Sequence, residues 1–581
     1  MALREERVAA PADSGHLGVA AFTHRRRWPP AAAVALALTA GALLAVRCDR
    51  PPFFDNEGRF AEVAREMVES GDWITPRLDG TLFLNKPPLT YWLAGLVFRV
   101  TGPSEWARLV PVLAAVVTLF ATCRLGALLY GARVGLLAGV VLATSVGFAL
   151  EARTLRPDLV MAASIVVAIL CWLRGEHGSR RWTLGLWAAL GIGALAKGLV
   201  PLVVAGIPIG IASLRAHGWR GVGRIRPLAG LCVLAAIVLP WHVLVARQHA
   251  GFAWDYVVNQ HLLFFFDRKL PRDSEGDALW FFWTSFATRA LPWTILLPLA
   301  LPDAARGASR TATAAERASF FLATWAGGVL LFFSAAPSRL EHYSLPALPA
   351  AALLAARVWD LASAGRLGRA AWAWIAAAGT ALVAVGVVGL VDGRALLTRA
   401  YWIAEAPALF PLLVPAALTV VAIGALVLVA ALGRRAALLG GVLAGGMLVV
   451  VPIVLVALVD MTPVFSWRPV ADAIAAAVPS DVPIVFEAPE EYQQVGGLAF
   501  YTRRPIVILA PHGFVPPTYL EGQDIFLARE EFARRWTSGE RLALVSDPQQ
   551  RRDDAEGLVP GPYRVVAHFG DRWVLVNYAA R

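Results

Sequence analysis

Repeated apolar runs constrain the fold of this chain more than any other feature of its sequence. Segments of about 20 predominantly apolar residues, the length of a helix that crosses a bilayer, recur along roughly the first 460 positions. Of the 581 residues, 57% are hydrophobic and 16% are charged, against about 25% charged residues in soluble domains. The sequence therefore predicts an α-helical polytopic membrane protein with about 13 transmembrane helices.

The predicted spans are joined by two alternating sets of connections that differ in charge. The short connections of one set are rich in arginine, and such positive loops stay in the cytoplasm. The N-terminus, with Arg25, Arg26 and Arg27 before the first span, is then a retained signal anchor that begins inside, and the C-terminus lies outside. The predicted spans are 28–47, 106–129, 133–150, 157–173, 183–196, 199–214, 228–246, 290–302, 318–335, 342–358, 371–391, 407–431 and 435–459.

Three regions follow from this topology. We expect residues 1–27 to form a cytoplasmic tail, residues 28–459 a transmembrane domain, and residues 460–581 a soluble domain on the outer side. Two large outer loops, 48–105 and 247–289, belong to the transmembrane domain. In the last region β-like runs interleave with helical segments, which predicts a small α/β fold. The runs are VPIVFE, PIVIL, DIFLA, RLALVS, YRVVAHF and RWVLVNY.

Charge and cysteine content argue against several other classes of protein. The net charge of +11 is weak evidence for nucleic-acid binding, because the Arg and Lys of membrane proteins gather in cytoplasmic loops. The four cysteines show neither the spacing of a zinc site nor that of a disulfide framework. The soluble region has no Gly-rich phosphate loop and no HExxH or GxSxG motif.

The first outer loop gathers charge in an otherwise apolar chain. Apolar residues repeat at helical spacing from Phe60 to Met67, which predicts a short amphipathic helix over the bundle or on the membrane surface, ended by Gly71. Farther along, Lys86 precedes two prolines, which keep it out of the α region and stiffen the backbone. We therefore expect a rigid extended backbone segment to fix the direction of the Lys86 side chain.

Asp55 and Asp158 are the candidate catalytic carboxylates. Asp55 begins the helical segment of the first loop, where Asp is also a favoured N-cap, and Glu57 is the rival carboxylate. Asp158 follows Pro157 where the chain re-enters the bilayer, a position at which an acid also stabilises a helix N-terminus. Charge at this boundary is costly unless it is paired or used. Two such acids bind a divalent metal or divide base and positioning roles.

Lys197 lies between two short apolar spans on the outer face. A lysine in this position either extends its amine to the interface or pairs with an inward carboxylate. We expect it to pair with Asp55 or Asp158.

Further cations and rings occur in the loop 247–289 and in the turn before the span 342–358. Arg268 and Lys269 suit phosphate binding, Arg through its fork and Lys as a point charge. His261 is either an ordinary hydrogen-bonded histidine or a metal ligand, and the neighbouring Phe264–Phe266 run is typical of an interfacial anchor. We expect Lys86, Arg268, Arg339 and Tyr343 together to hold a phosphate.

Three motifs of the chain resemble a known family. They are Asp55-x-Glu57-Gly-Arg59-Phe-Ala-Glu62, Lys86-Pro-Pro-Leu-x-Tyr91-Trp92 and His342-Tyr-x-Leu-Pro346. With the Asp158 turn and Ala196-Lys197-Gly198-Leu199, they resemble the lipid A aminoarabinose transferase group of C-type membrane glycosyltransferases, relatives of the protein O-mannosyltransferases. The chain departs from that family in having Asn56 between the two acids, where adjacent Asp-Glu is usual.

This resemblance implies a sugar donor carried on polyprenyl phosphate and used on the periplasmic face of a bacterial inner membrane, with inversion at the anomeric carbon. The acceptor would be lipid A, another envelope glycan or a protein. Asp55 would be the catalytic carboxylate, with Asp158 and Lys197 positioning the site, and the cofactor considered is a divalent metal bound by His261. The expected substrate-binding residues are Arg59, Lys86, Tyr91, Lys197, Arg268, Lys269, Arg339, His342 and Tyr343.

Two other functions compete with this hypothesis. A lipid or sugar transporter, or flippase, should place ionisable residues near mid-membrane and show paired half-repeats. In this sequence the charges collect at one face and no repeat is visible. A scaffold for envelope assembly would use residues 460–581 as a binding module.

Overall fold

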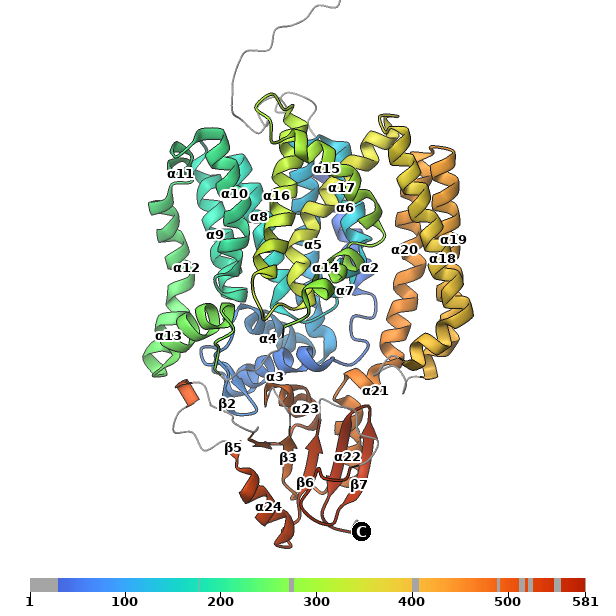
Figure 1. The fold of residues 1–581 in the computed structure, drawn as a ribbon. Coiled ribbons are helices and arrows are strands. Elements are labelled where there is room, and N and C mark those ends of the chain that lie inside the picture. Colours follow the sequence, from blue (N-terminus) through green and yellow to red (C-terminus); the bar gives the residue numbers. More distant parts are fainter. Residues whose placement is uncertain are drawn as a thin grey trace, which may run out of the picture.

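A bundle of long helices carries a layer of short helices and an α/β domain at one end (Figure 1). The computed structural model describes residues 30–176, 178–270, 276–399, 407–487, 492–510, 518–520, 526–547 and 555–579. The predicted cytoplasmic tail, residues 1–27, lies outside the described residues.

Among the described residues, nine helices are long and apolar enough to cross a membrane. The 3-10 turns η1 (Glu105–Arg108), η4 (Glu341–Ala347) and η5 (Pro407–Leu409) lead directly into three of them. The nine are α5 (Leu109–Leu129), α8 (Pro157–Gly175), α10 (Val200–His217), α12 (Pro227–Gln248), α16 (Ala314–Ser334), α17 (Leu348–Ser363), α18 (Arg369–Arg399), α19 (Phe410–Leu432) and α20 (Ala436–Asp460).

The other four predicted spans contain shorter or less apolar helices. They are α2 (Pro30–Ala45), α6 (Ala132–Ala143), α9 (Arg180–Lys197) and α15 (Leu297–Arg306), which follows the 3-10 turn η3 (Trp293–Leu296). The predicted span 133–150 is broken, because Thr144 and Ser145 turn their hydroxyls onto carbonyls of α6. The short helix α7 (Val146–Glu151) follows the break. The number of 13 transmembrane helices stays a prediction.

The first loop forms a layer across the end of the bundle (Figure 1). The predicted amphipathic helix is α3 (Asp55–Ser70), and its apolar stripe is buried. Gly71 ends it in the left-handed conformation, with φ of 74°, as predicted. A hairpin of β1 (Arg77–Leu78) and β2 (Thr81–Leu82) and a helix that sequence reasoning missed, α4 (Leu89–Thr101), complete the layer.

Shorter helices fill the remaining connections of the bundle. The second large loop holds α13 (Phe252–Trp254), the π-helical segment η2 (Asp255–Leu263) and α14 (Leu279–Arg289). The short helix α11 (Arg220–Arg224) joins α10 to α12 at the opposite end of the bundle from α3 (Figure 1).

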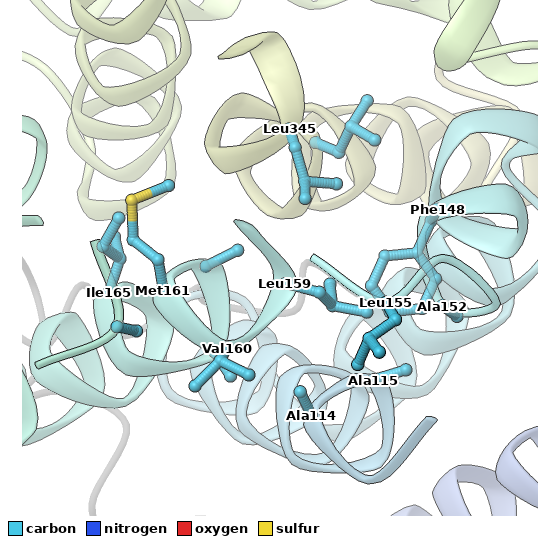
Figure 2. Close-up of a cluster of buried hydrophobic side chains, with 14 of the residues drawn as sticks. Ala114, Ala115, Phe148, Ala152, Leu155, Leu159, Val160, Met161, Ile165 and Leu345 are labelled. Carbon is cyan, nitrogen blue, oxygen red and sulfur yellow. The ribbon is translucent and has the colours of Figure 1, made fainter. Parts of the chain in front are cut away.

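Helix α8 is the centre of the bundle, and its apolar side chains are buried on all sides. In Figure 2, Leu159 of α8 lies between Leu345 of η4 and Ala115 of α5. All three side chains are at most 1% exposed. This packing fixes the first turn of α8 against η4 and α5, because a filled core resists displacement of its elements.

The C-terminal region has a six-stranded sheet of order β5-β4-β3-β6-β8-β7. Strands β5, β4, β3 and β6 pair parallel with one another, whereas β8 pairs antiparallel with β6 and β7. Each β-like run of the sequence contains one strand: β3 (Ile484–Glu487), β4 (Ile506–Leu509), β5 (Phe526–Leu527), β6 (Ala543–Ser546), β7 (Arg564–Phe569) and β8 (Arg572–Val576). Its helices and 3-10 turns are α21 (Thr462–Phe465), α22 (Arg468–Ala477), η6 (Tyr492–Gln494), α23 (Val495–Thr502), η7 (Thr518–Leu520) and α24 (Arg529–Thr537).

Helix α23 packs directly on α3, backbone against backbone. A Cβ added at Gly58 of α3 would lie 2.4 Å from the Cα of Gly497 in α23, so only glycine fits. Tyr501 of α23 stabilises the packing of this helix on the first loop. Its hydroxyl accepts a hydrogen bond from the N–H of Phe53 (2.7 Å) and donates one to Glu105 (2.7 Å). The C-terminal domain is therefore seated firmly on the first loop.

Acidic side chains gather beside this contact. The Glu66 carboxylate accepts a hydrogen bond from the N–H of Gly80, and Asp79 accepts one from Ile506 of β4 (3.2 Å). Burial, aided by the nearby charge of Glu62, raises the pKa of Glu66 to about 7 and the pKa of Asp79 to about 7. Both carboxyl groups therefore hold protons in the folded protein at pH values where they are ionised in the unfolded chain.

Substituting Gly58 by alanine should destabilise the protein by about 1–3 kcal/mol, because the new methyl group meets backbone that cannot turn away. Thermal unfolding in detergent, followed by tryptophan fluorescence, should show a lower Tm. The control is Gly206→Ala in α10, where a Cβ would have no atom within 4 Å. Equal Tm values for the two variants would contradict the close contact of α3 with α23.

The acidic cluster predicts that stability falls as pH rises. A carboxyl group whose folded-state pKa is raised stabilises the fold fully below its unfolded pKa, near 4, and this stabilisation is lost as pH rises to about 7. Tm should therefore drop between pH 5 and pH 7.5, and Asp79→Asn and Glu66→Gln should each flatten the profile. Asp472→Asn, at an exposed site, should not. An unchanged slope in both cluster variants would refute this assignment.

Candidate active site

Two cavities meet at the end of the bundle that α3 covers. The first has a volume of about 300 Å³ and is lined by polar and charged side chains. The second has a volume of about 320 Å³ and is lined mainly by apolar and aromatic ones from α10, α16, η2 and the residues next to α10 and η2, including Leu199, Val203, Phe265 and Phe333. We call them the polar cavity and the apolar groove.

Six residues line both cavities and so mark their junction. Three of them, Lys86, Lys197 and Tyr343, were predicted as substrate-binding residues. They come from the first loop, the C-terminal end of α9 and η4, segments far apart in the sequence. The other three are Asn85, Gln260 and Phe264. Polar and apolar space therefore adjoin at a junction that is lined by two lysine side chains.

An ion pair between Lys197 and Asp158 forms one wall of this junction. Asp158 is 2% exposed in the first turn of α8, where Pro157 starts the helix. Lys197 Nζ donates to Asp158 Oδ1 and lies 4.4 Å from the centre of the Tyr343 ring. His342 Nε2 is 3.9 Å from the same oxygen of Asp158. The structure confirms the predicted pairing of Lys197 with Asp158.

His261 holds the turn that follows Lys197. Its Nδ1 bonds to the carbonyl of Tyr256 (2.6 Å), and its Nε2 accepts a hydrogen bond from the N–H of Leu199 (3.3 Å). Burial lowers the pKa of His261, which favours the neutral ring that this pattern needs.

The structure therefore does not support His261 as a metal ligand, because both ring nitrogens are engaged. Within the described ranges no three His, Cys, Asp or Glu residues are grouped so that they could hold a metal ion.

Glu57 is a structural residue and does not line the cavity, contrary to its prediction as a rival catalytic carboxylate. It is 1% exposed. Its Oε1 accepts hydrogen bonds from Arg108 Nε (2.8 Å) and the N–H of Leu155 (2.7 Å). Its Oε2 accepts from Arg108 Nη2 (2.6 Å) and from the N–H of Phe54 (3.1 Å). A carboxylate bonded in this way has no oxygen left for a substrate.

The position of Asp55 is given by its backbone alone, since its side chain is outside the described set. It is the first residue of α3, one residue before Asn56 and four before Arg59. Both of those side chains line the polar cavity.

Three other predicted substrate-binding residues lie away from both cavities. Arg268 is exposed, whereas its neighbour Lys269 is buried and lines the polar cavity. Arg339 donates to the carbonyls of Ala336 and Pro337 in its own turn. Tyr91 is buried behind the cavity wall, where its ring stacks on Phe60 at 5.9 Å. Of the four residues predicted to hold a phosphate, the structure therefore brings Lys86 and Tyr343 together and places Arg268 and Arg339 outside both cavities.

Further residues that sequence reasoning did not select line the polar cavity. Asn85 precedes Lys86, and Arg156 precedes Pro157 and Asp158, so adjacency to a selected motif was a usable signal. Gln493 and Gln494 belong to the C-terminal domain, and no pattern in the sequence indicated that this domain reaches the cavity. The remaining residues of this kind are Asn56, Phe60, Phe83, Pro157, Gln260, Phe264 and Leu340.

Comparisons with known proteins agree with this geometry. The family model described as "Dolichyl-phosphate-mannose-protein mannosyltransferase" matches residues 85–243, a range that includes Lys86, Asp158 and Lys197. A curated protein of Edwardsiella ictaluri, "Undecaprenyl phosphate-alpha-4-amino-4-deoxy-L-arabinose arabinosyl transferase", is 33% identical over 52% of this chain and 54% of its own length. A protein of the same description from Erwinia tasmaniensis is 30% identical over 57% and 60%.

The matched range and the descriptions of these relatives agree with the resemblance to the C-type membrane glycosyltransferases. The solved structure of ArnT from Cupriavidus metallidurans bound to undecaprenyl phosphate is similar to this chain in fold, with a TM-score of 0.74 and 24% identity. The match covers 94% of this chain and 98% of that one, so the fold is shared over nearly the whole length. By sequence, the chain spans about half the length of the curated glycosyltransferases it matches.

The Glu57–Arg108 pair predicts a loss of stability rather than a purely catalytic defect. Glu57→Gln leaves the Arg108 guanidinium buried without its counter-charge, which should cost about 3–5 kcal/mol of folding stability. A marked fall in Tm of the detergent-solubilised protein would show it. The double variant Glu57→Met with Arg108→Met should lose less than Glu57→Met alone. If Glu57→Gln keeps the wild-type Tm and loses only transfer, Glu57 is a reacting group instead.

Proposed function

We propose that this protein is a glycosyltransferase that moves a sugar from a polyprenyl-phosphate carrier to an acceptor at the periplasmic face of a bacterial inner membrane. The descriptions of its relatives, an undecaprenyl phosphate arabinosyl transferase and a dolichyl-phosphate-mannose mannosyltransferase, support this class of donor. The acceptor is lipid A, another envelope glycan or a protein.

The observation that carries the proposal is the junction between the polar cavity and the apolar groove. A sugar joined to an isoprenoid through a phosphate has a polar end, an oily end and an anion between them. The two cavities offer the same sequence of environments, with Lys86, Lys197 and Tyr343 where they meet. In this arrangement the isoprenoid lies in the apolar groove, the phosphate at the junction and the sugar in the polar cavity.

The cations of this junction stabilise the leaving group. As the acceptor oxygen attacks the anomeric carbon, the bond from that carbon to the phosphate oxygen breaks and the phosphate gains negative charge. Lys86 faces the charge that develops, and Asp158 orients Lys197 toward it, while Lys269 adds a positive charge from the wall of the polar cavity. One preorganised contact of this kind is typically worth about 3–4 kcal/mol of barrier.

Asp55 is the proposed general base. It takes the proton of the acceptor hydroxyl as the new carbon–oxygen bond forms, and polyprenyl phosphate leaves as an anion. If the acceptor is itself an anion, Asp55 orients it instead. A single displacement of this kind inverts the configuration at the anomeric carbon. The other residues of the polar cavity, Arg59 and His342 among them, bind the substrates.

The placement of charge disfavours a transporter. A transporter of sugar or lipid should hold its ionisable groups near the middle of the bundle. Here the charged residues that line the polar cavity come from α3, the two large loops, the start of α8, the last turn of α9 and η4, at the end next to the C-terminal domain.

Transfer should depend on Asp55 and Lys86 and not on Arg268. In proteoliposomes supplied with undecaprenyl phosphate bearing radiolabelled 4-amino-4-deoxy-L-arabinose or mannose, Asp55→Asn should lower product formation about 10²–10⁴-fold. Lys86→Gln should lower it about 10²–10³-fold. The control Arg268→Gln, at an exposed site, should match wild type.

Equal losses in Lys86→Gln and Arg268→Gln would contradict the phosphate site. A wild-type protein that releases no polyprenyl phosphate from either donor, yet moves the lipid across vesicles, would be a transporter.

A further inference from the structure

The C-terminal domain contributes to the polar cavity through two adjacent glutamines. Gln493 and Gln494 end the 3-10 turn η6 and line the cavity beside Asn56 and Arg59 of α3. Gln493 is 4% exposed, and Gln494 is partly exposed. A domain outside the membrane bundle thus provides part of the wall of the candidate active site.

The position of these glutamines is fixed by the contact of α23 with α3. Helix α23 begins at Val495, directly after Gln494, and its Gly497 lies against Gly58 of α3. A Cβ at Gly496 would lie 2.7 Å from the Cα of Arg59, so this glycine also permits the close approach. Because η6 runs directly into α23, the position of α23 on α3 determines where the side-chain amides of Gln493 and Gln494 lie.

Hydrogen bonds tie the domain to two cavity residues as well. Arg59 Nη1 donates to Gln493 Oε1 (2.7 Å), while Arg59 Nη2 donates to Asn56 Oδ1 (2.9 Å). The hydroxyl of Tyr519, in η7, donates to Asn85 Oδ1 (2.6 Å). A guanidinium can only donate, so the bond from Arg59 fixes which way the Gln493 amide faces.

The glutamines line the polar cavity and not the apolar groove. Neither they nor Asn56 nor Arg59 line the groove, whereas Lys86, Lys197 and Tyr343 line both spaces. A donor whose isoprenoid fills the groove and whose phosphate rests at the junction extends its sugar into the polar cavity, which the two glutamines line. The amides then meet the sugar and not the lipid.

Amide side chains are suited to a ligand that carries hydroxyl or amino groups and no net charge. Each offers two N–H donors and a carbonyl acceptor, and none of these changes with pH. Across the part of the chain that the structure describes, no hydrogen bond to the side chain of Gln494 is formed, and this side chain lines the cavity. It is therefore available to a bound molecule.

We propose that Gln493 and Gln494 hydrogen-bond the sugar of the lipid-linked donor and thereby select which sugar is accepted. This proposal rests on the proposed function, since it needs a sugar on a lipid phosphate. It gives the C-terminal domain a role as a specificity element of the active site. Sites that hydrogen-bond a substrate hydroxyl discriminate strongly against analogues that lack it, because the buried polar group is left unpaired.

The test compares binding of sugar-loaded and bare carriers. The probes are undecaprenyl phosphate, the same lipid bearing 4-amino-4-deoxy-L-arabinose, and the same lipid bearing mannose, each titrated into full-length protein in nanodiscs. Wild type should bind one loaded carrier more tightly than the bare carrier. Gln494→Ala should weaken binding of that carrier about tenfold and change binding of the bare carrier less than twofold. Gln493→Met should also change the preference between the two sugars.

Tyr501→Phe is the matched control. It removes hydrogen bonds that seat the domain on the first loop, but Tyr501 does not line the polar cavity. It should lower the Tm without changing the ratio of affinities for loaded and bare carriers.

Three results would overturn the proposal. Gln494→Ala could leave the affinity for every loaded carrier unchanged, or weaken loaded and bare carriers equally, in which case the residue does not contact the sugar. Wild type could bind the bare carrier as tightly as both loaded ones, in which case the sugar is not recognised although the carrier is. Absence of binding to any carrier is a separate result, which removes the proposed function itself.

Discussion

The buried ion pair between Glu57 and Arg108 holds the candidate active site together. It joins the first turn of α3 to the start of α5, and through the N–H of Leu155 it also reaches the turn before α8. Asn56 and Arg59 of α3 and Arg156 of this turn line the polar cavity. Removing one partner of such a pair leaves a charge in a medium that cannot solvate it. The geometry of the cavity therefore depends on an interaction that takes no part in binding.

Hydropathy was sufficient to predict most helices, because a helix in a bilayer must present apolar side chains over its whole length. It failed where polar side chains interrupt the backbone, as Thr144 and Ser145 do, and it missed α4, which is apolar but too short to cross. In the C-terminal region the runs of β-branched residues were a sufficient signal for the strands. The order of those strands in the sheet had no signal in the sequence.

The site was predictable only where topology forces residues together. Asp158 lies in the first turn of α8 and Lys197 ends α9 on the same side, so the cost of burying either charge alone favoured a pair, with Asp55 as the other candidate partner of Lys197. For Arg268 and Lys269, which are adjacent, no pattern says which side chain turns inward. Glu57 was misassigned because burial in a hydrogen-bond network and burial in a cavity give the same sequence signal. Gln493 and Gln494 depend on how one domain docks on another.

The glycine contact between α3 and α23 limits which segments of this protein can be exchanged with those of a relative. Replacing the C-terminal domain by that of a relative would bring a foreign helix onto Gly58, whose neighbour must have no side chain. A working chimera would have to exchange α3 along with the domain. A chimera joined only at the linker near residue 460, where the chain leaves its last long helix, would therefore break this contact. For the same reason, α3 and the C-terminal domain are constrained to evolve as a pair.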